Sequence, residues 1–180
     1  MRITDLLKPD AIRLDASVHT RDEAIDLLVD LHNQVGNLTD KAAYKQGILD
    51  REASGTTAIG DGIAIPHAKS AAVRTPGLAA LTVPGGVDYQ ALDGQPTTLL
   101  FMIAAPQGGD LPLEVLSRLT VLLMDADFRQ SLLSAGSVED FLRRIDDKEA
   151  ARFPDEPADS GGCRIRQNDP CLLSPPVMCG

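Results

Sequence analysis

The stretch TTLLFMIAAP, residues 97–106, is almost wholly apolar. A run of this kind indicates a central strand covered on both faces, because a strand with one face in water alternates apolar and polar side chains. A second apolar run, GLAALTVP at residues 77–84, precedes it, and the turn-rich residues between the two runs permit antiparallel pairing. The two runs therefore predict the middle of a mixed β-sheet.

Helical patterns lie on both sides of these strands in the sequence. Thr20 and Glu23 form a T-x-x-E capping box, which opens a row of apolar residues at helical spacing that ends at Gly36. The predicted helices cover residues 20–36, 40–53, 112–125, 125–136 and 137–145. Helices before and after a cluster of short strands predict an α/β fold, with a mixed sheet flanked by helices on both faces.

Composition limits the kind of partner. The chain has 180 residues, 43% hydrophobic side chains and a formal net charge of −9, which allows one sizeable core. Phosphate backbones would repel so acidic a chain, so no nucleic acid is expected as a general partner, whereas a basic protein face could bind. Because the sequence shows neither a signal peptide nor an apolar stretch of roughly 18 residues, we expect a cytoplasmic protein.

The composition changes near residue 147. We therefore predict one domain over residues 1–147, followed by a linker and an irregular, poorly ordered tail over residues 148–180. The first part of this segment is rich in Asp, Glu, Pro and Gly. The tail holds all three cysteines, Cys163, Cys171 and Cys179. With no histidine and no C-x-x-C pair beside them, these cysteines predict neither a metal site nor a disulfide framework for the domain.

The segment GDGIAIPHAKS, residues 60–70, places His67 directly after Pro66. A histidine at a strand end is either a satisfied structural residue or a group held out for chemistry. Pro66 stiffens the backbone entering His67, and Gly60 permits close backbone approach. Upstream, REASGTT supplies donors suited to an anion: Arg51, Ser54, Thr56 and Thr57. These neighbours favour a phosphoryl group over a metal ion.

Residues 52–68, EASGTTAIGDGIAIPHA, resemble the phosphohistidine signature of the fructose/mannitol-type enzyme IIA domains of the bacterial sugar phosphotransferase system. An acidic or amide residue is followed by apolar-Gly and then by apolar-Ala-apolar-Pro-His and a small residue, and Glu52, Gly60 and His67 are among the matching positions. The similarity extends over residues 1–147. LDGQP at residues 92–96 looks more like fructose-type members.

The resemblance implies a similar α/β fold, no cofactor and a definite role for each site residue. His67 would accept a phosphoryl group from the phosphocarrier protein HPr and pass it to a cysteine of enzyme IIB, and a sugar, expected to be fructose, would be phosphorylated later, during transport through the membrane subunit, enzyme IIC. Arg51 matches the family's active-site arginine. Ser54, Thr56 and the amides near Gly60 would add hydrogen bonds to the phosphoryl oxygens.

The sequence departs from the family at one position. Members commonly carry a second active-site histidine before a sequence like LEVLSRL, where this chain has Pro112, which has no side-chain donor. This substitution puts the transfer rate in doubt. His19 and His32 do not match the family motif, and we expect both at the surface.

Other interpretations remain open at this point. Arg51 could form a surface ion pair with Asp50 or Glu52, and Ser54 and Thr56 could be ordinary turn residues. A regulatory phospho-switch of the nitrogen-related type, slow or degenerate because of Pro112, is the alternative function, since phosphorylation would alter docking through its charge. A hydrolase using His67 as general base lacks a nucleophile motif such as G-x-S-x-G. Cys171 does not sit in a loop like that of a IIB domain.

Overall fold

The computed structural model describes residues 2–108 and 113–153, and they form an α/β fold around one mixed sheet. The strand order is β1-β5-β6-β3-β2, and β4 also pairs with β6. The strands are β1 (Leu7–Arg13), β2 (Ala58–Gly60), β3 (Ile63–Ala64), β4 (His67–Ser70), β5 (Gly77–Val87) and β6 (Thr97–Pro106). This arrangement confirms the predicted fold class.

The strand β6 is the centre of the sheet. It pairs antiparallel with β5 on one edge, and parallel with β3 and β4 on the other. Residues 99–105 of β6 are all buried, as the continuous apolar run predicted. The sequence analysis did not predict β1, which pairs parallel with β5, because its exposed middle, Lys8 to Asp10, breaks both strand and helix patterns.

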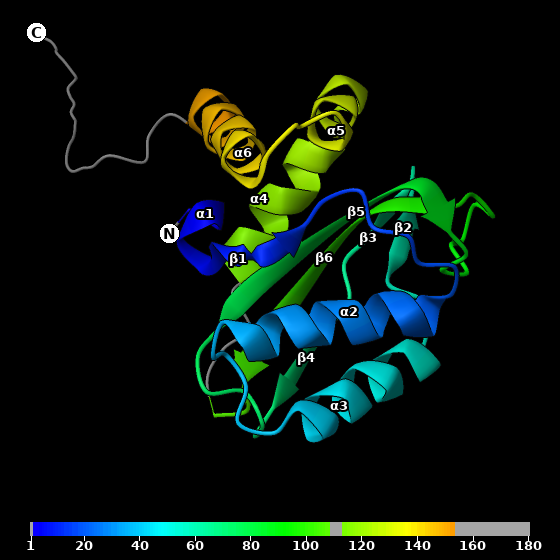
Figure 1. Cartoon of the computed structure of the whole chain (residues 1–180), viewed down its shortest axis with the longest axis vertical. Helices are drawn as coiled ribbons and strands as arrows, with labels where there is room; N and C mark the ends of the chain where they lie inside the picture. The colour runs from blue at the N-terminus through cyan, green and yellow to red at the C-terminus, as the bar shows by residue number, and fades with distance from the viewer. Residues whose placement is uncertain (1, 109–112, 154–180) are drawn as a thin grey trace, which may run out of the picture.

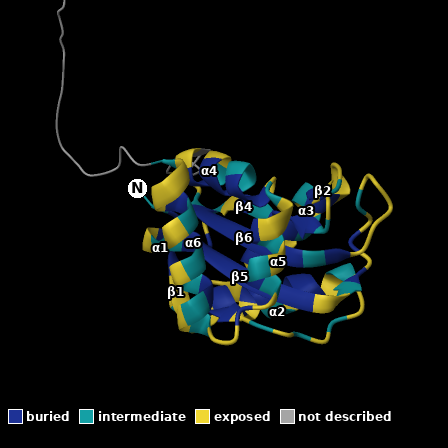
Figure 2. Ribbon diagram, turned by 90° about the horizontal axis from the view of Figure 1, so that it is seen from above, coloured by how far each residue is buried: buried dark blue, intermediate teal, exposed yellow. Residues whose placement is uncertain are grey.

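Helices cover both faces of the sheet (Figure 1). On one side lie α2 (Arg21–Gln34) and α3 (Lys41–Ala53); on the other lie α4 (Leu113–Leu123), α5 (Ala126–Leu133), α6 (Val138–Arg152) and the short α1 (Ile3–Leu6). The strands between these two layers are largely buried, whereas the outer helix surfaces are exposed (Figure 2). No helix in residues 2–108 or 113–153 has the length and apolar character needed to cross a membrane.

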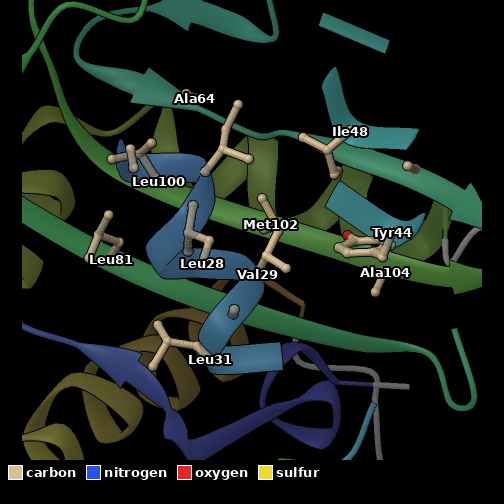
Figure 3. Packing of buried hydrophobic residues seen from close by; sticks show 14 of the residues in the cluster. Leu28, Val29, Leu31, Tyr44, Ile48, Ala64, Leu81, Leu100, Met102 and Ala104 are labelled. Carbon is tan, nitrogen blue, oxygen red and sulfur yellow. The ribbon is translucent and has the colours of Figure 1, made fainter. Parts of the chain in front are cut away.

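Alternate residues of β6 divide the core into two clusters. Leu100, Met102 and Ala104 pack toward α2 and α3, against Leu28 and Tyr44 among others (Figure 3). Their neighbours in the strand, at positions 99, 101 and 103, pack toward α4, α5 and α6. This alternation follows from the two-residue period of a strand. Because register partners on neighbouring strands point to the same face, the β6 residue opposite a given side chain shows which helix layer that side chain faces.

The prediction that His32 lies at the surface is wrong, whereas His19 is exposed as expected. His32 is 0% exposed at the C-terminal end of α2, and its ring makes an edge contact with Tyr44. Its Nε2 lies 3.0 Å from the Met102 carbonyl oxygen, and its Nδ1 lies 3.0 Å from the Asn37 amide nitrogen. The carbonyl can only accept, so Nε2 carries the proton and Nδ1 accepts.

Burial of His32 should make the protein acid-sensitive. Burial lowers the pKa of His32 from 6.5 to about 4, although the hydrogen bond to Met102 partly opposes this shift. Between those two values the unfolded chain binds one proton more than the folded chain, so the free energy of unfolding falls as the pH falls. The expected loss is about 1.4 kcal/mol per pH unit, and ~3 kcal/mol in total.

Urea unfolding at several pH values between 7 and 4 measures this dependence, with His32→Asn as the comparison. The variant should lose ~3 kcal/mol less than the wild type over this range, whatever its stability at pH 7. Equal losses in the two proteins would contradict a buried neutral His32.

Helix α6 continues beyond the predicted start of the linker at residue 148. Lys148 pairs with Asp125, with its Nζ 2.5 Å from the Oδ2 atom, and Glu149 is fully buried. Glu149 accepts hydrogen bonds from the Ile3 amide at 3.0 Å and from Arg118 Nη1 at 2.9 Å. These tertiary contacts extend the helix through a segment whose composition favoured a linker. The rest of the predicted linker and tail, from residue 154, lies outside the described residues.

Candidate functional site

His67 is the first residue of β4, directly after a break in the sheet edge. Strands β3 and β4 both pair with β6, and Ile65 and Pro66 separate them. The Ile65 amide donates to the Thr57 carbonyl at 3.1 Å, and the Pro66 carbonyl accepts from the Ile103 amide at 2.9 Å. The chain entering His67 is therefore held from both sides, and all peptide bonds in the described residues are trans.

The imidazole of His67 presents one nitrogen that is free for chemistry. Its Nδ1 lies 2.8 Å from the Ile65 carbonyl oxygen, which can only accept, so Nδ1 carries the proton of the neutral ring. The lone pair is then on Nε2, which has no hydrogen-bond partner within the described part of the chain. The side chain is half-buried, so the ring is held in place and can be reached by a second molecule.

The sheet pattern places His67 on the face covered by α4, α5 and α6. Ile103, the register partner of His67 on β6, belongs to the cluster on that face together with Ile63 and Ile65, whereas Ala68 belongs to the opposite cluster. Of the two histidines discussed, His32 is thus the satisfied core residue and His67 the available one. Pro112, which stands where the family has its second histidine, lies outside the described residues.

Arg51 lies in the last turn of α3 and has no acidic partner within 4.0 Å among residues 2–108 and 113–153. Its Nη1 donates to the Gly55 carbonyl at 3.1 Å. The suggested ion pairs with Asp50 or Glu52 are therefore absent. One turn before Arg51, Gly47 lies against Ala68, at 3.8 Å from a Cβ placed on the glycine, so the end of α3 runs beside the start of β4.

Within the described residues, Ser54 and Thr56 form their hydrogen bonds with groups other than His67. The Ser54 hydroxyl is exposed and lies 3.5 Å from the Asp50 carbonyl oxygen, at the end of α3. The Thr56 hydroxyl donates to the Tyr89 carbonyl at 3.2 Å and accepts from the Ala58 amide at 3.1 Å. These contacts are typical of cap and turn residues, and the role of the two hydroxyls toward a phosphoryl group stays a prediction.

Gly60 is the last residue of β2, at the start of a turn that the LDGQP segment fixes. Gly60, Asp61 and Gly62 have φ values of 98°, 58° and 80°, and a Cβ on Gly62 would lie 3.0 Å from Thr98 Oγ1. The Asp93 carboxylate accepts from the Asp61 amide at 3.0 Å and from the Gln95 amide at 3.0 Å. These two hydrogen bonds, of which the one from the Asp61 amide has the larger effect, hold the pKa of Asp93 below its usual value. Glycine and aspartate together therefore define the turn that leads into β3.

Sequence reasoning placed Glu52 in the motif and offered it as a surface ion-pair partner of Arg51, yet Glu52 is only 4% exposed. Its carboxylate accepts from the Thr57 amide at 3.1 Å, from the Thr57 hydroxyl and from the Tyr89 hydroxyl at 3.0 Å. Its position at the head of the motif was the one available signal. Within the described residues, no group of three His, Cys, Asp or Glu side chains could hold a metal ion.

Comparison with known proteins relates this site to one family. Residues 5–148 match the family model described as Phosphoenolpyruvate-dependent sugar phosphotransferase system, EIIA 2. A fructose-specific EIIABC component from Bacillus subtilis is 47% identical over 138 residues, which are 76% of this chain and 22% of that protein. A fructose-specific EIIA component from Haloferax volcanii is 40% identical over 152 residues, covering 81% of this chain and 99% of that protein.

Solved structures agree with the fold. The crystal structure of the nitrogen regulatory protein IIA-Ntr from Neisseria meningitidis matches 79% of this chain and 98% of its own, with a TM-score of 0.70 and 27% identity. In a complex from Escherichia coli, enzyme IIAMTL is bound to phosphorylated enzyme IIBMTL; it matches 79% of this chain and 99% of its own, with a TM-score of 0.68 and 25% identity.

Proposed function

The chain belongs to the EIIA type 2 family of the phosphoenolpyruvate-dependent sugar phosphotransferase system, and we propose that it carries a phosphoryl group on Nε2 of His67. The observation that carries this proposal is the hydrogen bond of 2.8 Å between His67 Nδ1 and the Ile65 carbonyl. It leaves the lone pair of a half-buried, partly accessible ring on Nε2. A neutral imidazole nitrogen is nucleophilic near neutral pH.

Transfer needs little beyond positioning and charge. The Nε2 lone pair attacks the phosphorus of a phosphohistidine on the donor protein in line with the bond that breaks, and that bond's electron pair returns to the donor imidazole. Nδ1 keeps its proton, which the Ile65 carbonyl stabilises as the ring gains positive charge. By its match to the family's active-site arginine, Arg51, whose charge no described acid neutralises, would hold the phosphoryl oxygens. In the second step a cysteine thiolate attacks the same phosphorus and the N–P bond breaks.

We assign HPr as the donor and a cysteine of enzyme IIB as the acceptor, with the sugar phosphorylated downstream during its transport through the membrane subunit, enzyme IIC. Fructose is the proposed sugar. It is supported by the names of the two fructose-specific relatives, which are 47% and 40% identical to this chain, and by LDGQP at residues 92–96. The domain itself would not contact the sugar, so these relatives support its place in a fructose system rather than a sugar site in this chain.

Incubation with phosphoenolpyruvate, enzyme I and HPr tests the proposal. Intact mass should rise by one phosphoryl group, in a form that acid hydrolyses, and fragmentation should place it on His67. Adding a fructose-type enzyme IIB should then discharge it. A chain that stays unmodified while a known enzyme IIA is phosphorylated in the same mixture would refute the proposal.

A regulatory phospho-switch is the second candidate, favoured by the structural likeness to the nitrogen regulatory protein and by Pro112. The two candidates differ in the second step. A regulatory protein would accept the phosphoryl group from HPr but would not be discharged by any sugar-specific enzyme IIB.

Restoring the missing histidine should speed transfer. A Pro112→His variant would supply a donor to the phosphoryl oxygens, and a hydrogen bond to a charged group contributes about 1.5 kcal/mol, or about tenfold in rate. Single-turnover transfer from phosphorylated HPr measures this, with Pro112→Ala as the control for losing the proline. An unchanged rate in Pro112→His would mean that the family's second imidazole is dispensable in this chain.

A further inference from the structure

The buried carboxylate of Glu52 is the strongest feature that phosphoryl transfer does not use directly. Among residues 2–108 and 113–153, no basic side chain lies within 4.0 Å of it, and only neutral donors satisfy it. A buried charge without a cation is costly unless hydrogen bonds replace its water shell. The three donors, two from Thr57 and one from Tyr89, therefore have to stay in place as long as Glu52 is ionised.

Tyr89 makes this arrangement rigid. It is 0% exposed, and burial, followed by the nearby Glu52 charge, raises the pKa of its hydroxyl, which stays protonated and donates to the carboxylate. The carbonyl of Tyr89 also accepts from the Thr56 hydroxyl at 3.2 Å. Thr56 and Thr57 are thus held from two directions, by the end of α3 and by the chain that follows β5.

Thr57 connects the carboxylate to the nucleophile through the backbone. Its carbonyl accepts from the Ile65 amide at 3.1 Å, and the Pro66 carbonyl accepts from the Ile103 amide at 2.9 Å. The short segment between these two anchors carries the Ile65 carbonyl, which accepts from His67 Nδ1 at 2.8 Å. Any shift of Thr57 would therefore turn the group that fixes the tautomer of His67.

We propose that Glu52 is a positioning residue, which keeps the proton of His67 on Nδ1 through Thr57 and Ile65 and so leaves Nε2 free. Its effect on transfer rests on the proposed function, but its effect on the tautomer does not. Glu52 does not touch the reacting atoms. Removing the Glu52 carboxylate should leave the imidazole of His67 present, while its ring exchanges between the two neutral tautomers.

Long-range ¹H–¹⁵N correlation spectra of the unphosphorylated protein report the tautomer of His67. The wild type should show the Nδ1–H form, and Glu52→Ala a mixture of both forms, with phosphoryl acceptance slowed about 10–100-fold. Glu52→Gln should recover most of both properties, because its amide oxygen still accepts from the Thr57 amide. Glu149→Ala removes another buried carboxylate, on α6, and should lower stability without moving the His67 tautomer.

An unchanged tautomer in Glu52→Ala would overturn the proposal, and so would an equal shift in Glu149→Ala. Should Glu52→Ala not fold, Tyr89→Phe removes one donor while keeping the buried ring, and it must shift the tautomer in the same direction. If the wild type accepts no phosphoryl group at all, the proposed function fails, yet the tautomer comparison still decides the role of Glu52.

Discussion

Replacing His67 with glutamine should abolish phosphoryl acceptance, lowering the rate by more than about 10⁴-fold, because the amide has no nucleophilic lone pair. The fold should persist. His67 is half-buried at the start of an edge strand, and a glutamine amide can still donate to the Ile65 carbonyl that now accepts from Nδ1. Intact-mass analysis after incubation with phosphoenolpyruvate, enzyme I and HPr gives the readout.

His19→Gln is the matched control for this variant. His19 is an exposed histidine that precedes α2, and its backbone amide, rather than its ring, makes the hydrogen bond to Glu23 at 2.8 Å. It should be labelled to the same extent as the wild type. Labelling of His67→Gln at wild-type stoichiometry would assign the phosphoryl group to another residue and remove the basis of the proposed function.

The sheet could be predicted from the sequence where burial is continuous, and less well elsewhere. The apolar run of β6 and the capping box of Thr20 and Glu23 are local signals, and the structure confirms both. In contrast, β1 has exposed residues in its middle, and α6 extends through Glu149 because of contacts with Ile3 and Arg118. Those contacts span more than a hundred residues of sequence in the case of Ile3, so no local pattern indicates them.

The site residues also fall into those that a local sequence pattern indicates and those that depend on distant contacts. Pro66 and His67 form a local motif, which sequence reasoning found, and a proline fixes the backbone wherever it stands. The role of Glu52 depends on Tyr89, which is 37 residues away. His32 was misplaced although a local signal existed: it follows Leu28 by four residues on the buried row of α2, and this spacing indicates burial.

The buried ion pair between α4 and α6 is expected to dominate the stability of that layer. Arg118 is 7% exposed, and its Nη1 lies 2.9 Å from Oε2 of the fully buried Glu149. Its guanidinium also lies over the Phe153 ring, 4.9 Å from the centroid, and its Nη2 lies 3.2 Å from Glu114. Arg118 thus neutralises a carboxylate that cannot reach water, and it does so from a different helix.

Arg118→Ala should therefore lower the free energy of unfolding by about 3 kcal/mol, because it removes the nearer cation from the buried Glu149 carboxylate and leaves, among the described residues, only Arg2, whose Nε lies 3.9 Å from Oε1. Urea denaturation should show a lower midpoint with an unchanged slope. The double variant Arg118→Met with Glu149→Leu removes both charges and should recover most of this loss, since apolar residues can replace a buried pair at little cost. Arg143→Ala, which breaks an exposed pair with Asp140, should cost less than about 1 kcal/mol. A double variant as unstable as Arg118→Ala would show that lost packing, rather than the stranded carboxylate, accounts for the effect.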